Sequence, residues 1–244
     1  MTRGQSSVGA IACALAGGIA FMASLVYFVA VYLGLPGPFT RAAPRDATTA
    51  GAVLIDLALF SAFALHHSLF ARLGFKAFIT RVAPPPLERS IYVWLSSLLF
   101  LLVAAWWQPV GGVLWRVDTS SPAMFALIGL QLVGVIAAVR TARRLDVLAL
   151  AGVRQVFAAR GGSMHGLETT GPYAFVRHPI YFAWLLFVWP VPLMNGTRLV
   201  FAAVSTIYLV IATPFEERDL TRAYGAEYEA YARRVRWRIL PGVF

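Results

Sequence analysis

Charged residues are scarce in this chain of 244 residues and make up only 13% of it. A soluble globular domain carries about 25% charged residues, so the composition excludes an ordinary water-soluble monomer. Disorder is excluded as well, because hydrophobic residues make up 59% of the chain and the mean hydropathy is +0.70. The composition indicates an integral membrane protein.

Cysteine and acidic residues are also few. Cys13 is the one cysteine and lies in an apolar stretch, which excludes a disulfide-stapled domain, a thiolate zinc site and a Cys-x-x-Cys redox motif. Eleven acidic residues stand against 21 basic ones, and the net charge is +10. The basic residues occupy short segments between apolar runs, which is typical of a membrane surface and not of a nucleic-acid site. We therefore expect membrane lipids as partners and no nucleic acid.

Long apolar runs recur along the whole chain. A helix needs about 20 apolar residues to cross the hydrocarbon core of a bilayer. Six stretches are candidates: residues 8–35, 51–70, 90–108, 122–139, 179–194 and 199–215. The fifth is short and is interrupted by Pro190 and Pro192. The sequence predicts an all-α fold, a polytopic membrane helix bundle of about six spans.

The basic residues also predict an orientation, since Lys and Arg favour cytoplasmic connections. If the N-terminus is cytoplasmic, all but four of the 21 basic residues lie on the inner side, the exceptions being Arg41, Arg45, Arg116 and Arg198. We expect a multi-pass protein of the bacterial inner membrane with both termini in the cytoplasm. Residues 1–139 would form the N-terminal spans, and residues 140–244 a functional region with the last two spans, within one integrated membrane domain.

The sharpest local motif is GPYAFVRHPIY at residues 171–181. Gly171 predicts a turn and Pro179 suits the first position of a helix. Arg177 and His178 are therefore expected at a cytoplasmic helix N-terminus, where backbone N–H groups and the helix dipole favour an anion. The arginine adds a planar fork that fits a carboxylate. A positive-inside anchor before a proline-started helix is the alternative.

A second motif begins where the sixth run is expected to end, at Phe215. Glu216 and Glu217 then reach the same membrane face as the arginine–histidine pair. Three tyrosines follow with spacings of four and three, which predicts one face of a helix: Tyr224, Tyr228 and Tyr231. An interfacial amphipathic helix with a tyrosine belt is the alternative.

Three ionisable residues lie inside the second apolar run: Asp56, His66 and His67. Asp56 and His67 are about 16 Å apart along a helix, too far to share a metal ion. We predict no metal site, and expect a structural polar contact or the lining of a substrate tunnel.

Together the two motifs resemble the isoprenylcysteine carboxyl methyltransferase superfamily, which comprises integral membrane enzymes. The resemblance rests on Arg177-His178-Pro179-x-Tyr181 followed by Glu216-Glu217 and the tyrosine series. The stretches at residues 67–90 and 108–109 resemble the bacterial branch that includes methanethiol S-methyltransferase and NnrU-like proteins. The resemblance implies S-adenosylmethionine as cofactor and methyl transfer as the reaction.

The resemblance, joined to the residue chemistry, implies roles for the motif residues. Arg177 and His178 would bind the cofactor's carboxylate, and Glu216 or Glu217 would accept hydrogen bonds from its amino group or ribose. The tyrosines would exclude water. The expected catalytic residues are Arg177, His178 and Glu217, and the expected cofactor-binding residues are Arg177, His178, Tyr181, Glu216, Glu217, Tyr228 and Tyr231.

The expected acceptor is a small or membrane-partitioned thiol, with His178 near enough to take its proton. Three alternatives stay open at this point. The acceptor could be the carboxyl group of a prenylcysteine or a similar lipid-like molecule. The Arg238-Ile-Leu-Pro241 tail is also similar to that of NADPH-dependent membrane reductases, and a non-enzymatic membrane component is the third alternative.

Overall fold

The computed structural model describes residues 8–44, 48–70, 81, 87–145 and 166–244. These residues fall into two compact units, one within residues 1–111 and the other formed by residues 112–145 and 166–244. Each unit is described by itself. Several stretches that figured in the sequence predictions lie outside the described residues, among them Arg72, Lys76, residues 82–86, Arg154 and Arg160.

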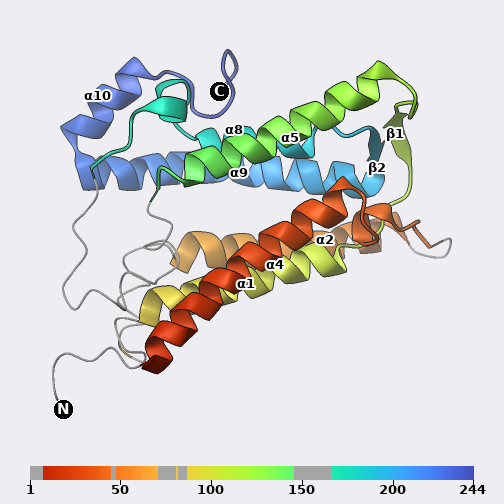
Figure 1. The fold of residues 1–244 in the computed structure, drawn as a ribbon, viewed down its shortest axis with the longest axis horizontal. Helices are drawn as coiled ribbons and strands as arrows, with labels where there is room; N and C mark the ends of the chain where they lie inside the picture. The colour runs from red at the N-terminus through yellow and green to blue at the C-terminus, as the bar shows by residue number, and fades with distance from the viewer. Residues whose placement is uncertain (1–7, 45–47, 71–80, 82–86, 146–165) are drawn as a thin grey trace. The chain divides into compact units, whose positions relative to one another are not determined.

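The first unit is built from three long helices (Figure 1): α1 (Val8–Leu33), α2 (Thr49–Phe70) and α4 (Glu88–Trp106), with the 3₁₀ turn η1 (Pro38–Thr40). Helix α4 packs against both α1 and α2. Gly17 lets α4 come close, because a Cβ there would lie 3.1 Å from the Trp94 ring. An aromatic cluster of Phe28, Phe39 and Phe100 fills the interior.

The second unit contains helices α5 (Pro122–Ala142), α8 (Pro179–Val188), α9 (Gly196–Tyr224) and α10 (Ala226–Arg234), and the 3₁₀ turn η3 (Gly171–Ala174). Helix α8 packs against α5 and α9. Contact with α5 is close at Gly134, where a Cβ would lie 2.8 Å from the Ala183 carbonyl oxygen. Gln131 secures the same contact by donating from Nε2 to the Phe187 carbonyl at 2.9 Å.

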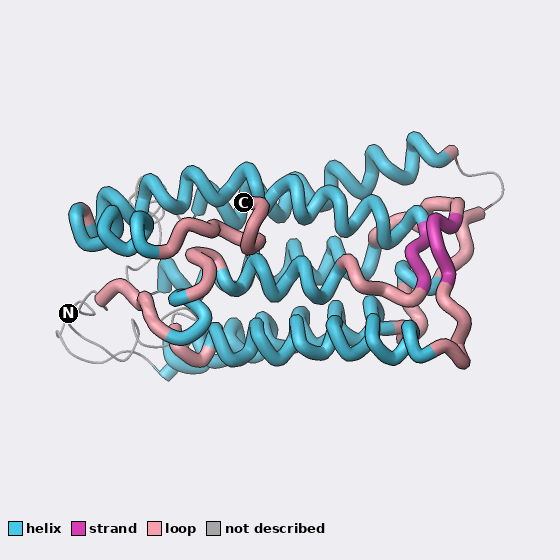
Figure 2. The backbone as a smooth tube through the Cα atoms, turned by 90° about the horizontal axis from the view of Figure 1, so that it is seen from above, coloured by secondary structure: helices cyan, strands magenta, loops and turns pink. Residues whose placement is uncertain are grey.

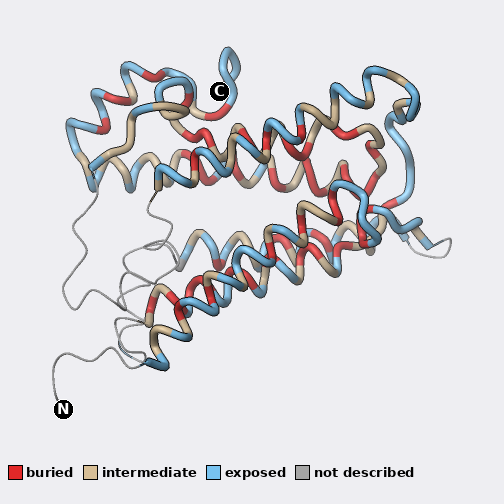
Figure 3. Tube along the Cα trace, viewed as in Figure 1, coloured by how far each residue is buried: buried red, intermediate tan, exposed pale blue. Residues whose placement is uncertain are grey.

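Five helices, α1, α2, α4, α5 and α9, are long and apolar enough to cross a membrane. Buried residues follow one side of each helix, while large apolar side chains remain exposed on the other (Figure 3). That pattern suits a bilayer, in which lipid tails would cover exposed apolar faces. The prediction of a polytopic, mostly helical membrane protein is confirmed.

The predicted length of the fifth span, residues 179–194, is wrong. Helix α8 has 10 residues, about 15 Å, because Pro190 and Pro192 cannot donate the backbone hydrogen bonds that would continue it. The chain instead forms strand β2 (Leu193–Asn195), which pairs antiparallel with β1 (Val113–Arg116). Figure 2 shows this pair in magenta. The expected all-α fold therefore has one small exception.

The end of the last long helix also differs from the prediction. Helix α9 continues past Phe215 as far as Tyr224, with Pro214 inside it. Gly225 then breaks the helix with φ of 56°, and α10 begins. The prediction that Tyr224 shares one helical face with Tyr228 and Tyr231 is consequently wrong, because the break separates them.

Candidate active site

The turn before α8 delivers the arginine–histidine pair to the start of that helix. Pro179 is the first residue of α8 and His178 is its N-cap, as the motif predicts. The backbone N–H groups of Arg177 and His178 donate to the carbonyls of Trp237 and Arg238 at 2.9 and 2.8 Å. The C-terminal segment is thereby fixed beside the helix start.

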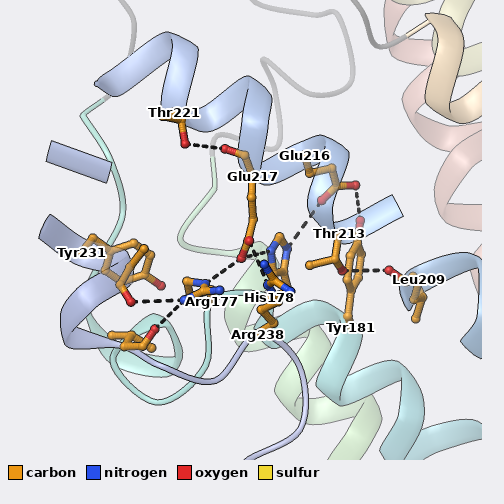
Figure 4. A network of polar contacts seen from close by, with 12 residues as sticks. Arg177, His178, Tyr181, Leu209, Thr213, Glu216, Glu217, Thr221, Tyr231 and Arg238 are labelled. Atoms are coloured by element: carbon orange, nitrogen blue, oxygen red, sulfur yellow. Dashed lines mark hydrogen bonds and ion pairs between the residues drawn. The ribbon is translucent and has the colours of Figure 1, made fainter. Parts of the chain in front are cut away.

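The Arg177 side chain is largely buried, and two of its guanidinium nitrogens contact other parts of the second unit (Figure 4). Its Nε donates to Glu217 Oε1 at 2.6 Å, and its Nη1 donates to the carbonyls of Val235 at 3.0 Å and Ala232 at 3.2 Å. The side chain is 10% exposed. Arg177 thus meets a carboxylate as its fork predicts, but this carboxylate belongs to Glu217.

Glu217 has a second cationic partner that the sequence did not reveal. Arg238 Nε donates to Glu217 Oε2 at 2.9 Å, so two guanidinium groups hold the two oxygens of one carboxylate. In the sequence, Arg238 was notable only as part of a reductase-like tail. Neither periodicity nor spacing signals this contact, which depends on the chain folding back after α10.

Glu216 lies on the opposite side of the His178 imidazole from Glu217. The Tyr181 hydroxyl donates to Glu216 Oε1, and His178 Nδ1 lies 3.5 Å from Oε2. On its opposite edge, His178 Nε2 lies 3.5 Å from Glu217 Oε1. The imidazole stacks on the Tyr181 ring with centroids 5.2 Å apart. Figure 4 shows the histidine between the two glutamates.

Two tyrosines of α10 are buried next to this network. The Tyr231 hydroxyl donates to the Tyr173 carbonyl at 2.8 Å. The Tyr228 hydroxyl is buried beside the Glu217 carboxylate. Burial raises the pKa of Tyr231 to about 12, and burial together with the Glu217 charge raises the pKa of Tyr228. Both hydroxyls therefore stay protonated and able to donate at neutral pH.

An open pocket of about 630 Å³ lies against one side of the network. Glu217 and Tyr228 reach it, as do Arg177 and Arg238, whereas Glu216 does not line it. Four arginines and two glutamates contribute to the wall in total: Arg177, Arg218, Arg222, Arg238, Glu217 and Glu229. The volume lies within the range of small-molecule sites, and the mixed charges suit a ligand that carries both signs.

The ionisable residues of the second apolar run lie in the other unit. Asp56 Oδ1 accepts a hydrogen bond from the Gln108 backbone at 2.7 Å. His67 Nδ1 lies 2.9 Å from the Tyr92 hydroxyl, and the His66 ring stacks on Tyr92. Where the chain is described, no three His, Cys, Asp or Glu residues gather as metal ligands.

Comparison with known proteins identifies the family to which this chain is related. The phospholipid methyltransferase family model matches residues 122–227, from α5 to the start of α10. A methanethiol S-methyltransferase of Crocosphaera subtropica is 36% identical over 217 residues, 88% of this chain and 85% of that protein. Methanethiol S-methyltransferase 1 of Bradyrhizobium diazoefficiens is 35% identical over 224 residues, 89% and 77% of the two chains.

A third relative, the methanethiol S-methyltransferase of Mycobacterium tuberculosis, is 38% identical over 188 residues, 75% of this chain and 76% of that protein. No solved structure matches the chain. The apolar helices and these relatives together define a membrane methyltransferase. The chain belongs to the phospholipid methyltransferase family. This confirms the predicted enzyme class over the reductase and the non-enzymatic alternatives.

Proposed function

We propose that this enzyme transfers a methyl group from S-adenosylmethionine to a small thiol, with methanethiol as the first candidate, and releases a thioether. The observation that carries the proposal is the match to methanethiol S-methyltransferases along most of both chains. The geometry supports it, because carboxylates and guanidinium groups converge beside a pocket of suitable volume.

The residues present fit the cofactor. The buried Tyr228 hydroxyl lies beside Glu217 and lines the pocket, and the partly exposed Arg238 side chain lines it as well. We assign the pocket to the cofactor, with Arg238 and Tyr228 toward its polar groups and Glu217 balancing its positive charge. When bound, the cofactor supplies a methyl group activated on a sulfonium.

The other predicted site residues take supporting roles in this proposal. Arg177 holds Glu217 and the C-terminal segment in place. The Tyr231 ring packs against the Tyr228 ring, with centroids 5.9 Å apart. His178, Tyr181 and Glu216 contact one another beside Glu217, and we keep them in the cofactor site as the motifs predict. Catalysis then consists of positioning the two reactants and excluding water, since an in-line displacement needs little else. We further propose that both termini, and with them this site, face the cytoplasm.

Radiolabelled methyl transfer tests the proposal directly. Purified protein in detergent, given labelled S-adenosylmethionine and methanethiol, should release label as dimethyl sulfide in the headspace. A farnesylcysteine analogue serves as the competing acceptor, because the predicted alternative is carboxyl methylation of a lipid-like molecule. Label found only in that analogue would overturn thiol methylation and leave the methyltransferase class intact.

A further inference from the structure

Bulky apolar side chains are exposed in two short segments of the second unit that lie outside its helices. Phe175 follows the η3 turn and is 74% exposed, and Val243 is exposed to the same extent. Trp237 and Leu240 are exposed as well. None of the four belongs to a helix that could cross the membrane. The lipid-facing sides of the long helices therefore do not explain their exposure.

Backbone hydrogen bonds hold the two segments together. The Arg177 N–H donates to the Trp237 carbonyl at 2.9 Å, and the His178 N–H donates to the Arg238 carbonyl at 2.8 Å. Phe175 precedes this pairing by two residues, so both exposed aromatic residues come from neighbouring stretches of backbone. The paired stretches lie next to the start of α8 (Figure 1).

The segment after Trp237 is a closed loop with a buried and an exposed side. Three consecutive backbone N–H groups, those of residues 238–240, donate to the Phe244 backbone oxygen at 2.9, 2.9 and 3.0 Å. The Ile239 side chain is buried, whereas Leu240 and Val243 are exposed. The loop is therefore anchored through Ile239 while its other apolar side chains remain on the surface.

Basic side chains accompany the apolar ones. Arg233, Arg234 and Arg236 are exposed, and residues 233–244 include no acidic residue. Arg233 lies 3.9 Å from Glu229, but both side chains are largely exposed, and such pairs contribute little. These neighbours form what we call the aromatic–basic surface: Phe175, Arg233, Arg234, Arg236, Trp237 and Val243.

This combination of side chains matches the interface of a bilayer that contains anionic lipids. Tryptophan is enriched at the level of the lipid headgroups, and exposed arginines beside it attract negatively charged headgroups. A protein partner could also cover exposed apolar groups. Lipid is the better match, because the same unit contains α5 and α9, two helices that are long and apolar enough to cross a membrane.

We propose that the aromatic–basic surface binds anionic phospholipids. Its apolar side chains insert at headgroup level, and its arginines contact the lipid phosphates. The phosphate is recognised by charge, and the insertion depends on the apolar groups, so the two contributions can be separated by experiment. This interaction does not involve the methyl acceptor and goes beyond the proposed function.

Single fluorescent labels measure both insertion and lipid preference. Cys13→Ser removes the one cysteine of the chain, and Val243→Cys or Phe175→Cys then receives a nitrobenzoxadiazole fluorophore. Each full-length protein is reconstituted in nanodiscs of phosphatidylcholine with a minority of phosphatidylglycerol. The lipid composition is kept constant. Only the lipid that carries a quenching nitroxide near the top of its acyl chain is exchanged.

Both labels should be quenched, and nitroxide on phosphatidylglycerol should quench at least about twofold more than nitroxide on phosphatidylcholine, because arginines concentrate anionic lipids around them. The control label is Ser120→Cys, in the connection between β1 and α5, where residues 117–121 include no basic residue. This label should show no preference for phosphatidylglycerol.

Replacement of the three exposed arginines by glutamine separates charge from insertion. With Arg233, Arg234 and Arg236 replaced together, the label at Val243→Cys should still be quenched, but equally by the two nitroxide lipids. If this triple variant does not fold, Arg236→Gln alone provides the second measurement and should reduce the preference.

Absence of quenching at either Val243→Cys or Phe175→Cys would overturn insertion and favour a protein partner for this surface. Equal quenching by the two lipids before any arginine is replaced would overturn the preference for anionic lipid. A preference that is unchanged after the arginine replacements would do the same. Methyl transfer is not measured in this experiment, so its result is independent of the test of the proposed function.

Discussion

At the residue scale, Arg177 joins four segments of the second unit. It stands at the start of α8 and contacts Glu217 of α9, Ala232 of α10 and Val235 beyond it. Removal of one partner of an enclosed ion pair costs about 3–5 kcal/mol. We predict that Arg177→Ala lowers the thermal unfolding midpoint in detergent and weakens S-adenosylhomocysteine binding at the same time.

Arg222→Ala is the control for this prediction, since its pair with Asp219 is exposed on both sides and such pairs contribute little. Its unfolding midpoint should stay close to that of the unaltered protein. An Arg177→Ala protein that unfolds normally and loses only binding would mean that the arginine serves the ligand directly.

The two buried tyrosines of α10 give a second prediction, because the Tyr231 hydroxyl donates to Tyr173 whereas Tyr228 lines the pocket. Tyr231→Phe deletes a hydrogen bond to Tyr173 and should lower stability by about 1 kcal/mol, with a small effect on cofactor affinity. Tyr228→Phe deletes a hydroxyl that lies beside Glu217 and lines the pocket. This change should lower thermal stability no more than Tyr231→Phe does, and should weaken S-adenosylhomocysteine binding more. The opposite assignment of effects would rule out Tyr228 as a ligand contact.

Residue chemistry explains which contacts could be anticipated. Topology alone brought Glu216 and Glu217 level with Arg177 and His178, because consecutive spans return to the same membrane face. The partners within that group were not predictable, since pairing depends on rotamers and on the course of the C-terminal segment. Arg238 shows this most clearly, because its contact with Glu217 requires the chain to return beside the start of α8.

At the scale of elements, hydropathy predicted the long helices well because each must cover about 30 Å of hydrocarbon. Hydropathy did not predict the short length of α8. Apolar residues continue past Val188, whereas Pro190 and Pro192 end the helical hydrogen bonding of the backbone. The break between α9 and α10 was not predicted either, because a single glycine within a periodic pattern does not reveal its backbone conformation.

That break gives the third prediction. Gly225 has φ of 56° and ψ of −129°, a region open almost solely to glycine. A Cβ there would touch nothing within 4 Å, so the cost of Gly225→Ala is backbone strain of about 1–3 kcal/mol. We expect lower thermal stability and weaker S-adenosylhomocysteine binding, because α10 carries Tyr228. Gly166→Ala, at a glycine with open space and no positive φ, should change neither.

At the scale of the whole molecule, the distribution of charge predicts which membrane face holds the site. Arginines crowd the second half of α9, α10 and the segment after them, whereas the connection between β1 and α5 carries Asp118 and no basic residue. Because basic segments are retained in the cytoplasm, the two regions should lie on opposite sides. A cytoplasmic site would also have direct access to S-adenosylmethionine, which is charged and does not cross a bilayer unaided.

The scarcity of cysteine makes this orientation measurable. Cys13→Ser yields a chain without cysteine, into which single cysteines can be placed at two exposed positions, Ser120 between β1 and α5, and Arg233 in α10. On intact cells, a membrane-impermeant maleimide should label Ser120→Cys and spare Arg233→Cys, and permeabilisation should make both reactive. Labelling of Arg233→Cys on intact cells would place the site outside the cytoplasm and invert the predicted topology, since α10 and the Arg177 network belong to one packed unit.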